Sequence, residues 1–172
     1  PLEIFMIWKG GMSFHGGLVG VVVGTIAYCK KINYEPIIFL DILACVTPIG
    51  LFFGRIANFI NGELYGKPTE LSWGVIFPNI DNIPRHPSQL YEALLEGLVL
   101  FIVLNVIIKN SKYRKGLCSS LFLIFYGIFR ILSEMFREPD EHIGYLLNLI
   151  STGSLLSFIM VIAGTLMYLK YK

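Results

Sequence analysis

Apolar residues occur in five long runs along the chain, separated by short polar connections. The runs cover residues 14–29, 36–60, 90–108, 117–136 and 150–169. A helix that crosses a bilayer needs about 20 apolar residues, within a range of about 17–25. The last four runs meet this requirement. The first is shorter and rich in glycine, and it needs flanking residues to reach the length of a spanning helix. Because hydrocarbon forces backbone hydrogen bonds to close within each segment, every run is expected to be helical. The pattern therefore predicts an all-α, polytopic membrane protein with about five transmembrane helices.

The charges of the connections predict how these helices are oriented. Lysine and arginine follow the first, third and fifth runs, at residues 30–31, 109–115 and 170–172. The other two connections, 61–88 and 137–149, are acidic or mixed. Since basic loops stay on the cytoplasmic side, the beginning of the chain is expected outside and its end inside. Residues 1–172 are accordingly expected to form a single integral-membrane domain, with an extracytoplasmic loop over 61–88.

Composition supports the membrane class and excludes several others. The 172 residues are 55% hydrophobic and 15% charged, with a net charge of +2. Soluble domains carry about 25% charged residues. The small net charge, without basic runs interleaved with aromatic residues, excludes nucleic acid as a partner. The three cysteines lie far apart without metal-ligand spacing and are interpreted as structural thiols. The residues therefore suggest no metal and no other cofactor.

Two arginines lie where the apolar pattern would otherwise place leucine. Arg55 is in the second run and Arg130 in the fourth. A guanidinium in hydrocarbon costs about 2.5–3.5 kcal/mol on insertion scales. Each arginine has a polar neighbour on the same helix face, because Asn58 follows Arg55 by three positions and Glu134 follows Arg130 by four. The planar guanidinium matches phosphate oxygens and keeps its charge, so the pattern favours an anion site.

Further polar residues lie at the same depth, in the outer half of the membrane. They are His15, Glu63, Gln89, Glu92, Glu96, Tyr126 and Arg137. The inner halves offer little beyond Asp41 and Thr47, which argues against a path for ions across the membrane. The sequence therefore predicts a phosphate site that faces outward, with an imidazole at its rim that titrates near neutrality. A phospholipid head group is its expected occupant.

Structural interpretations stay open for several of these residues. His15 could satisfy a helix end, and the polar pairs of the second and fourth runs could be contacts between helices. Glu92 and Glu96 follow a helix start, where the positive end of the helix dipole favours carboxylates, and the structural interpretation is preferred for them. Ser88 is a candidate N-cap for the same helix. Because these residues cluster at one depth, a purely structural role for all of them at once is the less favoured interpretation.

Four motifs resemble those of one enzyme family. They are GGMSFHGGLVG at 10–20, GRIANFINGELYGKP at 54–68, RHPSQLYEALLEG at 85–97 and YGIFRILSEMFREPD at 126–140. Their order and the loops between them are similar to those of prolipoprotein diacylglyceryl transferases, over nearly the whole chain. The resemblance implies a multi-pass protein of the bacterial cytoplasmic (inner) membrane, with its active site toward the extracytoplasmic side. It also implies transfer of the diacylglyceryl group of phosphatidylglycerol to the thiol of a prolipoprotein lipobox cysteine, with release of glycerol phosphate.

The resemblance further implies residue roles. The expected catalytic residues are His15, Tyr126, Arg130 and Glu134. The residues expected to bind phosphatidylglycerol are Arg55, Asn58, Glu63, Gly66 and Arg137. Arg55 and Arg130 would hold and stabilise the phosphate, while His15 would accept the thiol proton or orient its acceptor. Which group is the actual base stays open. The expected partners are phosphatidylglycerol, the lipobox segment and membrane lipids.

Two alternatives and one expectation about length complete the prediction. Another membrane enzyme that processes phospholipid head groups would share the same pocket, and an anion transporter is a weaker alternative. Members of the family begin with additional membrane helices, one of which contributes a functionally important tyrosine. Nothing before Pro1 supplies them in this sequence. The 172 residues alone are therefore expected to be inactive, and the parent protein active.

Overall fold

The protein is described here by a computed structural model with two compact units. The described backbone comprises residues 14–112, 114–138, 145–146 and 150–171. The side chains of residues 14, 15, 145, 146 and 150–152 lie outside this description. The units are residues 1–40 and 41–172, and each is described by itself.

The first unit contains one complete helix, α1 (Phe14–Lys31), which coincides with the first apolar run. Its last turn carries Lys30 and Lys31, where positive charge complements the negative end of the helix dipole. A short turn, with Asn33 at a φ of 52°, leads into α2 (Pro36–Asn61). The first expected helix is therefore confirmed as a helix.

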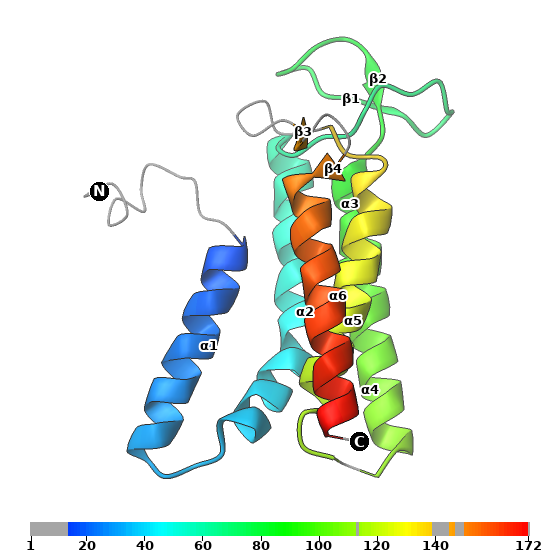
Figure 1. Ribbon diagram of the computed structural model, residues 1–172. Coiled ribbons are helices and arrows are strands. Elements are labelled where there is room, and N and C mark those ends of the chain that lie inside the picture. The colour runs from blue at the N-terminus through cyan, green and yellow to red at the C-terminus, as the bar shows by residue number, and fades with distance from the viewer. Residues whose placement is uncertain (1–13, 113, 139–144, 147–149, 172) are drawn as a thin grey trace, which may run out of the picture. The chain divides into compact units, whose positions relative to one another are not determined.

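The second unit is a group of long helices that lie alongside one another (Figure 1). It consists of the greater part of α2, followed by α3 (Ser88–Glu92), η3 (Ala93–Val99), α4 (Leu100–Asn110), α5 (Leu117–Glu134) and α6 (Thr152–Lys170). The α3, η3 and α4 segments follow one another without a break, and η3 is a stretch of wider π-helix. Such π-helical turns inside α-helices are frequent at functional sites.

Glycine allows two of the helix contacts to be unusually close. A Cβ atom on Gly127 of α5 would lie 2.7 Å from the carbonyl oxygen of Ser157 in α6. A Cβ atom on Gly97 of η3 would lie 2.7 Å from the Cβ of Phe52 in α2. Small residues commonly let helix backbones approach each other in membranes. These contacts fix how η3 is rotated against α2 and how α5 is rotated against α6.

Four described helices are long and apolar enough to cross a membrane. They are Pro36–Asn61, Ser88–Asn110, Leu117–Glu134 and Gly153–Lys170. These spans confirm the last four predicted runs to within a few residues at each end, and with them the prediction of a multi-pass helical membrane protein. Helix α1 is not among the four, so the expected total of about five is approximate.

The start of α5 is held by a buried carboxylate from α2. Asp41 is 2% exposed, and its two oxygens accept hydrogen bonds from the backbone N–H of Gly116 at 2.7 Å and of Ser119 at 2.9 Å. The Ser119 hydroxyl adds a third bond at 2.7 Å. An acidic side chain at a helix N-terminus satisfies otherwise unpaired N–H groups and complements the helix dipole. Asp41, which the sequence predicts in the inner half, therefore has a structural role.

The connection between α2 and α3 contains short extended segments and no long helix, as its glycines and prolines predict. Strands β1 (Val75–Ile76) and β2 (Pro84–Arg85) pair antiparallel. A second small pair, β3 (Tyr145–Leu146) with β4 (Ile150–Ser151), precedes α6. The prediction that Ser88 caps α3 is wrong, because Pro87 occupies the N-cap position and makes no side-chain cap bond.

Candidate active site

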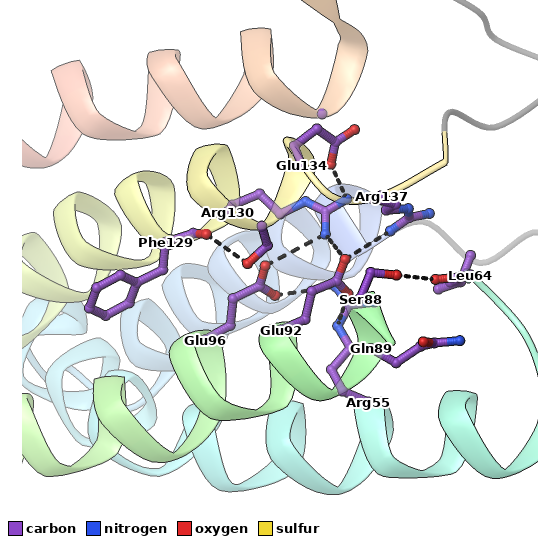
Figure 2. Close-up of polar contacts among 12 residues, drawn as sticks. Arg55, Leu64, Ser88, Gln89, Glu92, Glu96, Phe129, Arg130, Glu134 and Arg137 are labelled. Carbon is purple, nitrogen blue, oxygen red and sulfur yellow. Dashed lines mark hydrogen bonds and ion pairs between the residues drawn. The ribbon is translucent and has the colours of Figure 1, made fainter. Parts of the chain in front are cut away.

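The charged groups of α2, α3, η3 and α5 meet in one arginine–glutamate cluster, defined as Arg55, Glu92, Glu96, Arg130, Glu134 and Arg137 (Figure 2). The cluster lies within the second unit, at the ends of the helices that lead into the loops at 61–88 and 135–138. All of its members belong to the outer half predicted from the charge pattern.

Glu92 is the centre of the cluster. Its Oε1 lies 2.7 Å from Arg130 Nη1 and 3.6 Å from Arg137 Nη1. Its Oε2 lies 2.9 Å from Arg55 Nε. The Glu92 side chain is completely buried. One carboxylate therefore joins arginines that come from α2, from α5 and from the segment after α5.

Glu96 forms a second, longer set of contacts one helical turn away. Its Oε2 accepts a hydrogen bond from Arg55 Nη2 at 3.3 Å. Its Oε1 lies 3.5 Å from Arg130 Nη1, and the side chain is completely buried. Both carboxylates thus lie between the same two guanidinium groups, and they keep Arg55 and Arg130 close to each other.

Glu134 pairs with Arg130 along the same helix, as the spacing of four residues predicts. Glu134 Oε2 lies 2.7 Å from Arg130 Nη2, and its side chain is 15% exposed. An ion pair at this spacing reduces the cost of placing a guanidinium in hydrocarbon. The predicted Arg130–Glu134 pair is confirmed as a contact in the structure.

The cluster is buried and carries no formal net charge. Three arginines face three glutamates, and the arginine side chains are only 7–13% exposed. Buried ions are costly unless they are paired with good geometry, and removal of one partner leaves an uncompensated charge. The arrangement holds several N–H donors in fixed positions in a medium of low polarity, which is the requirement for stabilising an anion.

Two residues at the start of α3 fix the turn that follows α2. Ser88 Oγ donates a hydrogen bond to the carbonyl oxygen of Leu64 at 2.9 Å, and Gln89 Nε2 donates one to the carbonyl oxygen of Glu63 at 2.6 Å. Leu64 has a φ of 56°, and Gly62 a φ of 71°. A leucine rarely adopts this conformation, so the two side-chain bonds stabilise an otherwise unfavourable turn close to the cluster.

Gly66 lies where three backbone segments meet. A Cβ atom there would lie 2.7 Å from the carbonyl oxygen of Phe136 and would contact the His86 backbone. Gly66 also bridges to Arg137, and the N–H of Lys67 donates to Phe136 O at 2.9 Å. No side chain fits in this position, so backbone packing alone requires a glycine at residue 66. This packing requirement is separate from the expected role of Gly66 in lipid binding, and the two are compatible.

Arg85 organises the outer loop. Its guanidinium pairs with Asp81 at 2.7 Å and with Glu138 at 3.2 Å, and it lies 4.9 Å from the centre of the Tyr65 ring. Its Nη1 also donates to the carbonyl oxygen of Gly66 at 3.2 Å. The hydrogen bond from Arg85 holds the pKa of the Asp81 carboxyl below its usual value. Arg85 therefore links β2 to the segment that follows α5.

The other predicted site residues lie at different places. Tyr126 is buried on α5, about one turn inward from Arg130, and stacks on Phe122. Asn58 is half-buried on α2, and its carbonyl accepts the Glu63 N–H at 2.9 Å. The Glu63 side chain is exposed, so the contacts of the described residues bring the Glu63 backbone, and not its carboxylate, to the site.

His15 belongs to the first turn of α1, in the first unit. Its side chain lies outside the described residues, so the predicted catalytic role of this histidine stays a prediction. No group of His, Cys, Asp or Glu in the described part of the chain has the arrangement of a metal site.

The ion-pair partners of Glu92 and Glu96 go beyond what the sequence predicts. The structural interpretation that was preferred for them assigned both to the helix dipole, whereas their carboxylates pair directly with Arg55 and Arg130. A signal was available, because two acidic residues lie four positions apart in an apolar helix, at the predicted depth of Arg55 and Arg130. The number of buried positive charges already required a matching number of negative ones.

Comparison with known proteins identifies relatives across the whole chain. The family model for prolipoprotein diacylglyceryl transferase matches residues 1–170. A phosphatidylglycerol–prolipoprotein diacylglyceryl transferase from Rickettsia akari is 53% identical over 167 residues, which are 96% of this chain and 64% of the relative. The proteins of that name from Rickettsia bellii and Azospirillum brasilense are each 51% identical, covering 99% and 95% of this chain. The chain spans 65% and 63% of those two relatives, and therefore less than two thirds of each of the three.

Proposed function

The chain belongs to the prolipoprotein diacylglyceryl transferase family, and from this membership and the arginine–glutamate cluster we propose that the protein transfers a diacylglyceryl group from phosphatidylglycerol to a prolipoprotein. The acceptor is the thiol of the lipobox cysteine. The observation that carries the proposal is the buried cluster around Glu92, which holds Arg55 and Arg130 together at the end of three helices.

The proposed reaction exchanges one bond for another. The thiolate sulfur attacks the phosphate-bearing carbon of the diacylated glycerol, so that a C–S bond forms and the bond from this carbon to the phosphate oxygen breaks. The electron pair of that bond leaves with the phosphate oxygen, and the product is glycerol phosphate. The thiol proton passes to a base before or during the attack, because a thiol with an ordinary pKa of about 8.5 is mostly protonated at neutral pH.

Two arginines suit the charge that develops in this step. Negative charge grows on the departing phosphate oxygen, and fixed donors in a medium of low polarity stabilise such charge most strongly. In the proposal Arg55 and Arg130 hold the phosphate, Glu134 keeps Arg130 in place through its 2.7 Å contact, and Arg137 adds a third cation near Glu92. Asn58, Glu63 and Gly66 shape the turn that receives the head group.

The proton acceptor is assigned by resemblance. His15 is proposed to accept the thiol proton or to orient the acceptor, because an imidazole titrates near neutrality. Tyr126 lies one turn inward from Arg130 on the same helix. It is proposed, by the same resemblance, to be a further catalytic residue.

The inner half of the second unit supports an enzyme over a transporter. A transporter requires polar groups that continue through the membrane. Asp41 is bound to the start of α5, and Thr47 Oγ1 donates to the Leu43 carbonyl at 2.7 Å. Asp41 and Thr47 thus have local structural roles. We place the site on the extracytoplasmic side of the bacterial cytoplasmic membrane, because the basic connections lie at the opposite ends of the helices.

The proposal is tested with the complete gene product in membranes that contain phosphatidylglycerol, together with a synthetic lipobox peptide. Mass spectrometry is expected to detect a peptide whose cysteine has gained one diacylglyceryl unit. Membranes of phosphatidylethanolamine alone serve as the control and should give no product. Absence of product in phosphatidylglycerol membranes, with folded protein present, would refute the proposed function.

A further inference from the structure

The cluster contains as many carboxylates as guanidinium groups. This balance of charge affects how tightly the cluster binds a phosphate monoester compared with a phosphate diester. Arg55 and Arg130 are both paired with Glu92 and Glu96. We propose that these two carboxylates weaken the hold of the arginines on a phosphate monoester, so that the product can leave. This inference rests on the proposed function and concerns the same site.

The contacts show that carboxylate and phosphate would compete for the same donors. Glu92 Oε1 and Glu96 Oε1 both lie near Arg130 Nη1, at 2.7 Å and 3.5 Å. Glu96 Oε2 lies 3.3 Å from Arg55 Nη2. Arginine binds carboxylates and phosphates through the same planar set of N–H groups. A phosphate that approaches either guanidinium therefore meets a site whose charge is already neutralised.

The chemistry of the reaction makes this competition useful. The lipid phosphate is a diester with one negative charge, whereas glycerol phosphate is a monoester with a second pKa near 6 and nearly two charges at neutral pH. Three uncompensated arginines would attract the product more strongly than the substrate, and the attraction would be large in a buried site. Slow product release would then limit turnover. Glu92 and Glu96 reduce this difference by repelling the added charge.

Glu96 offers the sharper test of the two. Its contacts with Arg55 and Arg130 are longer than those that Glu92 makes with the same two arginines, so its removal disturbs the geometry less. Glu96→Gln keeps the shape of the side chain and removes its charge. The matched control is Glu138→Gln, which removes a carboxylate from an ion pair with Arg85 outside the cluster.

The experiment measures binding of glycerol phosphate to the complete gene product in zwitterionic nanodiscs, by calorimetry, with glycerol as an uncharged reference. Glu96→Gln is expected to bind glycerol phosphate about ten-fold more tightly than wild type, or more. Glu138→Gln should bind it as wild type does. In turnover assays Glu96→Gln should show stronger product inhibition and a lower kcat without a higher KM for phosphatidylglycerol.

Unchanged or weaker binding of glycerol phosphate by folded Glu96→Gln would overturn the inference, and a rise in KM together with weaker product binding would assign a purely structural role. Glu92→Gln provides a second variant, because it removes the charge of the other carboxylate, and it should change binding in the same direction. The binding comparison needs no transfer activity. A wild-type protein that fails to transfer the diacylglyceryl group refutes the proposed function alone, and the binding result still decides the present inference.

Discussion

The Glu92 carboxylate on α3 lies 2.7 Å from the Arg130 guanidinium on α5 and, through its other oxygen, 2.9 Å from Arg55 on α2. A single buried acid on α3 thus connects α3 to both α2 and α5. Its position also explains how two arginines can remain in apolar segments, because each positive charge has a negative partner at contact distance.

The first prediction concerns stability. Glu92→Ala leaves buried arginines without a central partner, and the loss is expected to be about 3–5 kcal/mol of unfolding free energy. Glu138→Ala breaks an ion pair whose acidic side chain is 40% exposed, and should cost less than about 1 kcal/mol. Equilibrium unfolding in mixed micelles measures both. Equal losses in the two variants would contradict the central role of Glu92.

The second prediction concerns the anchoring of α5. Asp41→Ala removes three hydrogen bonds from Gly116 and Ser119, and should lower the unfolding free energy by about 1–3 kcal/mol. Ser119→Ala removes only the hydroxyl bond and should cost about 1 kcal/mol. Thermal unfolding of the purified variants checks the order. A larger effect of Ser119→Ala than of Asp41→Ala would argue against the capping role.

The third prediction compares the effect on activity of replacing two glycines that lie twelve positions apart, Gly54 and Gly66. Gly66→Ala places a methyl group against Phe136 and His86, and should reduce transfer by at least about ten-fold because the turn that borders the cluster has to move. Gly54→Ala, next to Arg55 on α2, meets nothing within 4 Å. It should leave activity unchanged, and the helix is expected to gain about 0.5–1 kcal/mol. Similar activity of both variants would remove the packing argument for Gly66.

The fourth prediction is a pH dependence of the outer loop. The hydrogen bond from Arg85 lowers the pKa of Asp81 relative to about 3.9 in an unfolded chain. The pair therefore stabilises the loop above about pH 4, and this contribution is lost as the pH falls through the lowered pKa. The fluorescence of Trp73, obtained as the difference between the protein and its Trp73→Phe variant, reports on the loop. The acid transition should disappear in Asp81→Asn, and its persistence there would contradict the assignment.

Much of the fold follows from the lengths of apolar runs and from the charges between them. The starts of α2 at Pro36 and of α5 at Leu117 agree with the sequence prediction. The Arg130–Glu134 contact could also be predicted from the sequence, because a spacing of four residues places both side chains on one face of a single helix. These features depend only on local sequence.

The partners of Arg55 and Arg130 on α3 and η3 could not be predicted in the same way. A contact between helices depends on how each helix is rotated, and the rotation of η3 against α2 is set by close packing at Gly97. The π-helical stretch Ala93–Val99 further shifts the register of Glu96 relative to a regular α-helix. The links from Arg85 to Asp81 and Glu138 likewise depend on the path of an irregular loop.

The most direct test of the central claim compares three arginines in one transfer assay. Arg55→Gln, Arg130→Gln and Arg114→Gln are made in the complete gene product, and diacylglyceryl transfer to a lipobox peptide is followed by mass spectrometry. Arg55 and Arg130 belong to the cluster, whereas Arg114 is exposed in the connection between α4 and α5. The account predicts a loss of at least about 10²-fold for the first two and nearly full activity for the third. Full activity of folded Arg55→Gln or Arg130→Gln would contradict the claim that the cluster is the site of reaction.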